Sequence, residues 1–81
     1  MEKILQKRIS MDPRIMTGKP VIRGTRIPVK LIIRMLAQGI PDSDIMKEYP
    51  KIKHIDIQAA LEYAAQVLDN ENVYPLPYLA Q

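Results

Sequence analysis

Five basic side chains between residues 19 and 34 are the ones whose types and spacing best suit binding chemistry. They are Lys19, Arg23, Arg26, Lys30 and Arg34. Lysine and arginine bind phosphate and carboxylate groups, and arginine does so with a planar fork of N–H donors. The cluster therefore favours an anionic partner, which could be a nucleic acid or an acidic protein surface.

Two of these arginines are expected to lie in a β-hairpin. A two-residue loop Gly24-Thr25 with Gly first is typical of a type II′ turn, because Gly accepts the positive φ of that position. In that register Arg23 faces Arg26, and Ile22 faces Ile27. Like charges directly opposite each other weaken a hairpin, so the arginine pair adds nothing to the local fold. The alternative is that both are ordinary solvated turn residues.

The other polar residues show no catalytic or metal-binding pattern. The chain has no cysteine and a single histidine, His54, which argues against a structural zinc site. Gly18-Lys19 does not start a phosphate-binding loop, because Pro20 stands where a Ser or Thr should hold magnesium. We therefore expect no enzymatic activity, no catalytic residue, no metal and no cofactor.

Charge is distributed unevenly along the 81 residues. Residues 1–34 carry nine Lys or Arg and two Asp or Glu, whereas residues 35–81 carry three and seven. This asymmetry fits a basic surface that binds nucleic acid or an acidic protein. It fits equally well a dimer in which the basic half of one copy meets the acidic half of the other.

The N-terminal part is expected to contain a strand and two turns before the hairpin. Ile4–Ile9 alternates enough for a short strand, and Asp12-Pro13 favours a turn. A second turn is expected around Gly18. The hairpin region then spans residues 4–27.

Three helices are expected over residues 28–70. Val29, Ile32, Ile33 and Leu36 form an apolar stripe after Pro28, and Gly39 ends this first helix. The second helix spans about 42–49 and is stopped by Pro50. The third runs from His54 to Asn70, with a predicted buried face made by Ile57, Ala60, Leu61, Ala64 and Leu68.

The last two helices, joined by a tight turn, resemble a helix-turn-helix unit. In such units the start of the last helix meets base edges, and here those residues are Lys53, His54 and Gln58, with Lys51 near a phosphate. Beyond Lys53 the last helix is acidic, which opposes entry into a DNA groove. A compact three-helix core without a ligand is the alternative.

The predicted architecture is a single mainly α domain over residues 1–70, a three-helix bundle of helix-turn-helix type preceded by a β-hairpin. Residues 71–81 form a proline-containing tail that is expected to be extended. No run is apolar enough to span a membrane, and no signal peptide is visible, so we expect a cytoplasmic protein. A small core without disulfides favours a homodimer.

Residues 5–66 resemble the prokaryotic family known as domain of unknown function 433. The resemblance rests on Asp12-Pro13, on the run from Gly18 to Val29, and on positions such as Gly39, Tyr49-Pro50 and Asp56-Ile57. It implies a homeodomain-like three-helix fold after a β-hairpin. The family usually has Ser or Thr where this chain has the helix-capping residues Pro41 and Lys53, and we expect Asp42 and Asp56 to compensate.

Some members of that family resemble antitoxins of VapB type, which pair with a PIN-like nuclease toxin. The resemblance therefore implies an antitoxin-like regulator that binds such a toxin, with operator DNA as a further candidate partner. The alternative is a dimeric protein-interaction module without a nucleic-acid role. In the first case the binding residues are the basic cluster at 19–34 and the residues at the start of the last helix.

Overall fold

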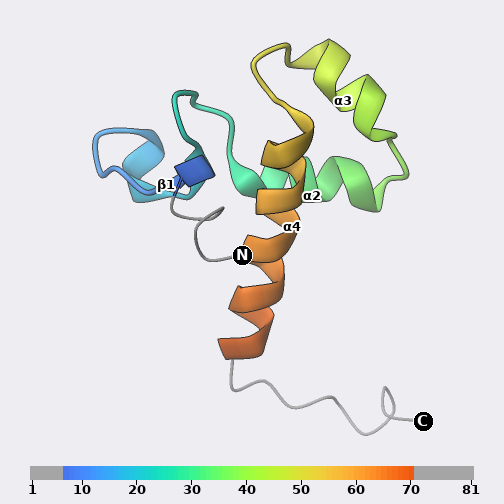
Figure 1. The fold of residues 1–81 in the computed structure, drawn as a ribbon. Coiled ribbons are helices and arrows are strands. Elements are labelled where there is room, and N and C mark those ends of the chain that lie inside the picture. The colour runs from blue at the N-terminus through green and yellow to red at the C-terminus, as the bar shows by residue number, and fades with distance from the viewer. Residues whose placement is uncertain (1–6, 71–81) are drawn as a thin grey trace, which may run out of the picture.

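A computed structural model describes residues 7–70 as a mainly helical protein with a small antiparallel sheet (Figure 1). The elements in chain order are β1 (Ile9–Ser10), the 3-10 turn η1 (Met16–Gly18), β2 (Val21–Ile22), α2 (Val29–Ala37), α3 (Asp42–Glu48) and α4 (His54–Asn70). All three helices lie where the sequence predicts them, and η1 is the predicted turn around Gly18. The predicted tail lies outside the described residues.

The sheet pairs β1 with β2 in antiparallel register, with Ile9 opposite Ile22 and Ser10 opposite Val21. The sequence predicted a strand over Ile4–Ile9, but the backbone at residues 7 and 8 is helical. Residues 4–6 lie outside the described part of the chain. β1 and β2 each contain two residues, and beyond them the N–H of Arg23 donates to the carbonyl of Arg8 at 2.8 Å.

The turn after β2 has a different type from the predicted one. The N–H of Thr25 donates to the carbonyl of Ile22 at 3.0 Å, so the turn spans Ile22–Thr25 and Gly24 is its third residue. Gly24 has φ +82°, and a positive φ at the third position is the geometry of a type II turn. The prediction of a type II′ turn with Gly24 as its first central residue is wrong.

The predicted register across this loop is partly retained. Ile22 donates its N–H to the carbonyl of Ile27 at 3.0 Å, as expected for facing residues. The side chain of Thr25 closes the loop, because its Oγ1 donates to the Ile22 carbonyl at 2.7 Å and accepts the Ile27 N–H at 3.0 Å. Arg23 and Arg26 therefore lie in a four-residue loop and do not form a cross-strand pair.

Gly39 ends α2 and begins the connection to α3. Its N–H donates to the carbonyl of Leu36 at 3.0 Å, and the N–H of Ile40 donates to that of Met35 at 3.1 Å. These two bonds form a Schellman motif, which needs the positive φ of +84° that Gly39 adopts. The predicted helix end is confirmed. No side-chain hydrogen bond caps α3, so the expected compensation by Asp42 is absent.

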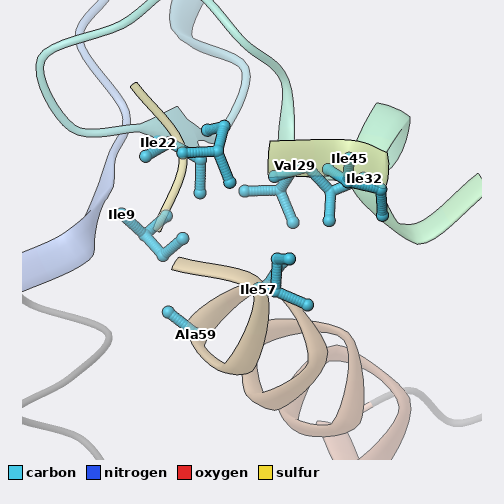
Figure 2. Packing of buried hydrophobic residues seen from close by; sticks show 9 residues of the cluster. Ile9, Ile22, Val29, Ile32, Ile45, Ile57 and Ala59 are labelled. Atoms are coloured by element: carbon cyan, nitrogen blue, oxygen red, sulfur yellow. The ribbon is translucent and has the colours of Figure 1, made fainter. Parts of the chain in front are cut away.

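Isoleucines from every main element meet in the core. Ile22, Ile32, Ile45 and Ile57 come from β2, α2, α3 and α4, and each is at most 1% exposed. Figure 2 shows these side chains converging with those of β1 and α2. Full burial of such a side chain stabilises the fold by about 1.5–3 kcal/mol. The core therefore joins the sheet to all three helices.

Asp56 ties the start of α4 to the N-terminal segment. Its carboxylate is fully buried and accepts two hydrogen bonds, one from Arg8 Nε at 2.6 Å and one from the Lys53 N–H at 2.8 Å. The second bond caps the helix from its third residue. The expected compensation by Asp56 for a missing hydroxyl cap is confirmed.

The buried face of α4 is shorter than predicted. Ile57 and Ala60 are buried as expected, but Leu61 is 49% exposed and Leu68 is 70% exposed. Figure 1 shows the reason, because the second half of α4 extends away from α3 and the hairpin region. Within residues 7–70 no helix is long and apolar enough to cross a membrane.

Candidate functional site

The predicted binding residues fall on separate parts of the surface. All are exposed, and they are Lys19, Arg23, Arg26, Lys30, Arg34, Lys51, Lys53, His54 and Gln58. Lys30 and Arg34 line a groove between α2 and α4. Arg26 and Lys51 line a second hollow beside the turn after β2. Lys19, Lys53, His54 and Gln58 line neither.

The groove between α2 and α4 has a volume of about 530 Å³ and an almost entirely apolar lining. Its wall on α2 includes Ile33 and Ala37, and its wall on α4 includes Tyr63, Val67 and Leu68. Val67 and Leu68 are exposed to solvent. These exposed apolar residues make the groove the candidate interaction site among the described residues.

The spacing of residues along the two helices produces this groove. Val29, Ile33 and Ala37 recur every four residues, which places them on one face of α2. On α4, Ala64 and Leu68 are spaced in the same way. Because Ala37 and Ala64 have short side chains, the two helices do not fill the space between them.

A basic edge borders the groove on α2. Lys30 and Arg34 are one helical turn apart and both are exposed. The ion pairs within residues 7–70 involve Arg8, Arg14 and His54, and none of them involves this edge. An apolar groove beside two available cations suits a partner whose apolar face is flanked by carboxylates.

The second hollow brings together residues distant in sequence. Arg26 comes from the turn after β2 and Lys51 from the connection between α3 and α4. Gly24 and Thr25 also line it. Neither Arg26 nor Lys51 takes part in the ion pairs found within residues 7–70, so two cations in one hollow suit an anionic ligand.

Arg23 has a structural role that the sequence did not reveal. Its main-chain N–H donates to the carbonyl of Arg8 at 2.8 Å, and its guanidinium donates to the carbonyls of Lys7 at 3.1 Å and Ile9 at 3.0 Å. The expectation that Arg23 adds nothing to the local fold is wrong. These three hydrogen bonds connect the turn after β2 to residues 7–9.

The start of α4 presents the residues predicted to meet base edges. Gln58 is exposed, and Nδ1 of His54 lies 3.3 Å from Oδ2 of Asp42 on α3. The N–H of Lys53 is used by Asp56, but its side chain is exposed. Beyond Lys53, α4 contains acidic residues and no Lys or Arg. Its charge therefore opposes deep entry into a DNA groove.

The groove residues on α4 were missed as functional candidates. Leu68 and Ala64 were assigned to the core because apolar residues at helical spacing give the same pattern in a core and in an interface. The length of the stripe was the available signal, since it continues beyond the point where α2 and α3 could cover it. Among the described residues, no group of three His, Asp or Glu side chains could hold a metal ion.

Comparison with known proteins gives consistent matches. A family model described as "Protein of unknown function (DUF433)" matches residues 9–64, from β1 to most of α4. An uncharacterized protein of Archaeoglobus fulgidus is 52% identical over 29 residues, which cover 36% of this chain and 81% of that protein. The crystal structure of a DUF433 member protein from Anabaena variabilis superposes with a TM-score of 0.73 at 34% identity. That match covers 84% of this chain and 67% of the Anabaena chain.

Proposed function

The chain belongs to the DUF433 family, and from this premise we propose that it is an antitoxin-like regulator that binds a PIN-like nuclease toxin. The observation that carries the proposal is the apolar groove between α2 and α4 with Lys30 and Arg34 at its edge. The resemblance to VapB-type antitoxins supplies the class of partner, since the family itself is of unknown function.

The groove defines the chemistry of the partner. A helix or extended segment with two or three apolar side chains would cover Val67 and Leu68, which are exposed in this structure. Acidic residues beside that apolar face would pair with Lys30 and Arg34. Charge complementarity of this kind speeds association and fixes the orientation of the partner. The toxin surface that docks here is therefore apolar with an acidic border.

Operator DNA is the second ligand in this proposal. The helix order after a small sheet supports a homeodomain-like helix-turn-helix reading, in which α3 and α4 form the unit. Lys53, His54 and Gln58 stand exposed at the start of α4, where such a unit meets DNA. An antitoxin-like regulator would then use separate surfaces for toxin and DNA.

Titration of a purified PIN-like nuclease tests the toxin-binding part. Leu68→Asp should weaken binding at least tenfold, because it places a charge in the apolar lining of the groove. Leu61→Asp is the matched control, since Leu61 is an exposed leucine of the same helix that does not line the groove. Equal losses in both variants, or none, would contradict toxin binding in the groove.

The charged edge provides a second test with the same nuclease. Lys30→Glu together with Arg34→Glu should slow association and make it less sensitive to salt. Lys47→Glu is the control, because Lys47 is exposed on α3 and does not line the groove. The proposal fails if the charge-reversed edge binds the nuclease as fast as the wild type at low salt.

A homodimer is the alternative occupant of the groove. It is favoured by the exposed apolar residues Leu61, Val67 and Leu68, which lie on the projecting half of α4. Sedimentation of the wild type and of Leu68→Asp separates the two cases. A dimer that becomes a monomer on Leu68→Asp, with unchanged nuclease binding, assigns the groove to a second copy and supports the interaction-module reading.

A further inference from the structure

We propose that Arg26 and Lys51 together bind a backbone phosphate of duplex DNA in the hollow beside the turn after β2. This inference rests on the DNA-binding part of the proposed function and adds to it a specific contact outside α4. The ligand chemistry is a phosphodiester oxygen, which Arg and Lys side chains bind without reading the base sequence.

The fold brings the two cations together from distant parts of the chain. Arg26 belongs to the loop between Ile22 of β2 and Ile27, which are joined by a main-chain hydrogen bond. Lys51 lies in the connection after α3. Both side chains are exposed and both line the same hollow. The position of Lys51 is fixed by the neighbouring Ile52, which is buried in the core and donates its N–H to the Tyr49 carbonyl at 2.8 Å.

Arg26 and Lys51 are available for a ligand. Within residues 7–70, Arg8 and Arg14 pair with carboxylates and Arg23 is bound to main-chain carbonyls. Neither Arg26 nor Lys51 makes a side-chain hydrogen bond or an ion pair in that part of the chain. A bound phosphate would supply the negative charge that both side chains lack among the described residues.

The loop itself suits an anion. Gly24 has no side chain and nothing lies within 4 Å of the position that a Cβ would take, so the hollow is open on that side. The Thr25 hydroxyl is already bonded within the loop, which holds the loop in one conformation. Because the N–H groups of Thr25 and Ile27 are bonded within the loop, the donors for a phosphate are the side chains of Arg26 and Lys51.

The surrounding charge favours a polyanion over a single phosphate ion. Residues 7–34 carry eight Lys or Arg and one Asp or Glu, so the segment that contains Arg26 has a strong excess of positive charge. A duplex presents phosphates at regular intervals and can meet several cations at once, whereas a free ion meets only two. Because α4 is acidic beyond its first turn, contact with the backbone fits this protein better than insertion of α4 into a groove.

Binding of a short labelled duplex of mixed sequence tests the inference by fluorescence anisotropy. The wild type is compared with Arg26→Gln plus Lys51→Gln over a range of salt concentrations. One lost phosphate contact lowers the salt slope by about 0.9, so the double variant should lose up to about 1.8. Lys7→Gln plus Lys47→Gln removes the same charge from exposed positions outside the hollow and should change the slope much less. Thermal melts of all proteins should coincide.

Each other outcome overturns the inference in a distinguishable way. Equal losses in the two double variants would show that only net charge matters. An unchanged slope in the Arg26 and Lys51 variant, together with weaker binding by Gln58→Ala, would leave DNA binding at α4 and remove the hollow from it. If the wild type does not bind the duplex at low salt, both DNA binding at α4 and phosphate binding in the hollow are contradicted. If inorganic phosphate alone raises the melting temperature through Arg26 and Lys51 while DNA does not bind, the ligand is a free anion.

Discussion

The two halves of α4 carry similar apolar residues, but the fully buried ones all lie in the first half. Residues 54–60 include Ile57, Ala59 and Ala60, which are buried against α2, α3 and the sheet. Residues 61–70 include Leu61, Val67 and Leu68, which are exposed. The first half also holds the buried Asp56, whereas the exposed Asp69 lies next to the last residue of the second half. One half of the helix stabilises the fold, and the other half presents a surface.

This contrast shows that packing in the core explains only the first part of the apolar pattern along α4. A single small domain has room for one half of a 17-residue helix against its two shorter helices. The remaining apolar residues keep their helical spacing, because an interface requires the same spacing as a core. Mutations that separate stability from binding therefore test whether the two halves differ as described.

The largest expected effect comes from Ile57→Ala in the first half. Ile57 is 1% exposed, so its truncation should lower the free energy of unfolding by about 2–5 kcal/mol through lost burial and a cavity. Leu68→Ala in the second half should change it by no more than about 0.5 kcal/mol. Urea unfolding of both variants measures the difference. Similar losses would mean that the second half is also packed against the fold.

The next effect concerns the acidic residues at the two ends of α4. Asp56→Ala removes a helix cap and leaves Arg8 without its carboxylate, so we expect a loss of about 2–3 kcal/mol, limited because Arg8 is partly exposed. Asp69→Ala, at an exposed position, should be within about 0.5 kcal/mol of the wild type. Thermal unfolding followed by circular dichroism compares them. Matching melting temperatures would refute a role for the Asp56 contacts.

Arg23 and Arg26 are expected to differ in the same manner, with a smaller effect on stability from one and an effect on binding from the other. Arg23→Ala should cost about 1–2 kcal/mol, because its guanidinium bonds to the carbonyls of Lys7 and Ile9 are lost. Arg26→Ala should leave stability nearly unchanged and reduce DNA binding instead. Chemical denaturation and DNA titration of both single variants provide the readout. The assignment is reversed if Arg26→Ala is the destabilising substitution.

The smallest expected effect on stability is that of Leu68→Asp. Its side chain is 70% exposed, so the free energy of unfolding should change by no more than about 0.5 kcal/mol. Binding of an apolar dye should fall, because the substitution removes part of the exposed apolar surface. A large drop in melting temperature would show that Leu68 packs against the fold and that the two halves of α4 are alike.

The sequence predicted the features that depend on local chemistry. The bounds of α4, the position of α2 and the role of Gly39 follow from helical spacing and from the conformation that glycine allows. The facing pair Ile22 and Ile27 follows from the alternation of apolar and polar residues. These signals act over a few residues, so one sequence suffices to read them.

The features that the sequence did not predict depend on contacts between distant residues. The sequence predicted Arg23 as a partner-binding residue, with a solvated turn residue as the alternative, because the carbonyls that bind it belong to another part of the chain. Leu61 and Leu68 were placed in the core because periodicity does not show where α2 and α3 end in space. The turn type at Gly24 was missed because a four-residue loop and a two-residue loop can carry the same residues.

The contact between Arg8 and Asp56 also bears on the order of events in folding. It joins residues 48 positions apart, so closing that loop costs chain entropy before the contact forms. The Schellman motif and the turn after β2 close over a few residues and can form first. We therefore expect the ion pair to be absent from the transition state, in which case Arg8→Ala, which leaves the local cap between Asp56 and the Lys53 N–H intact, accelerates unfolding and leaves the folding rate almost unchanged. Stopped-flow measurements in both directions test this, and their outcome decides whether the N-terminal segment docks last.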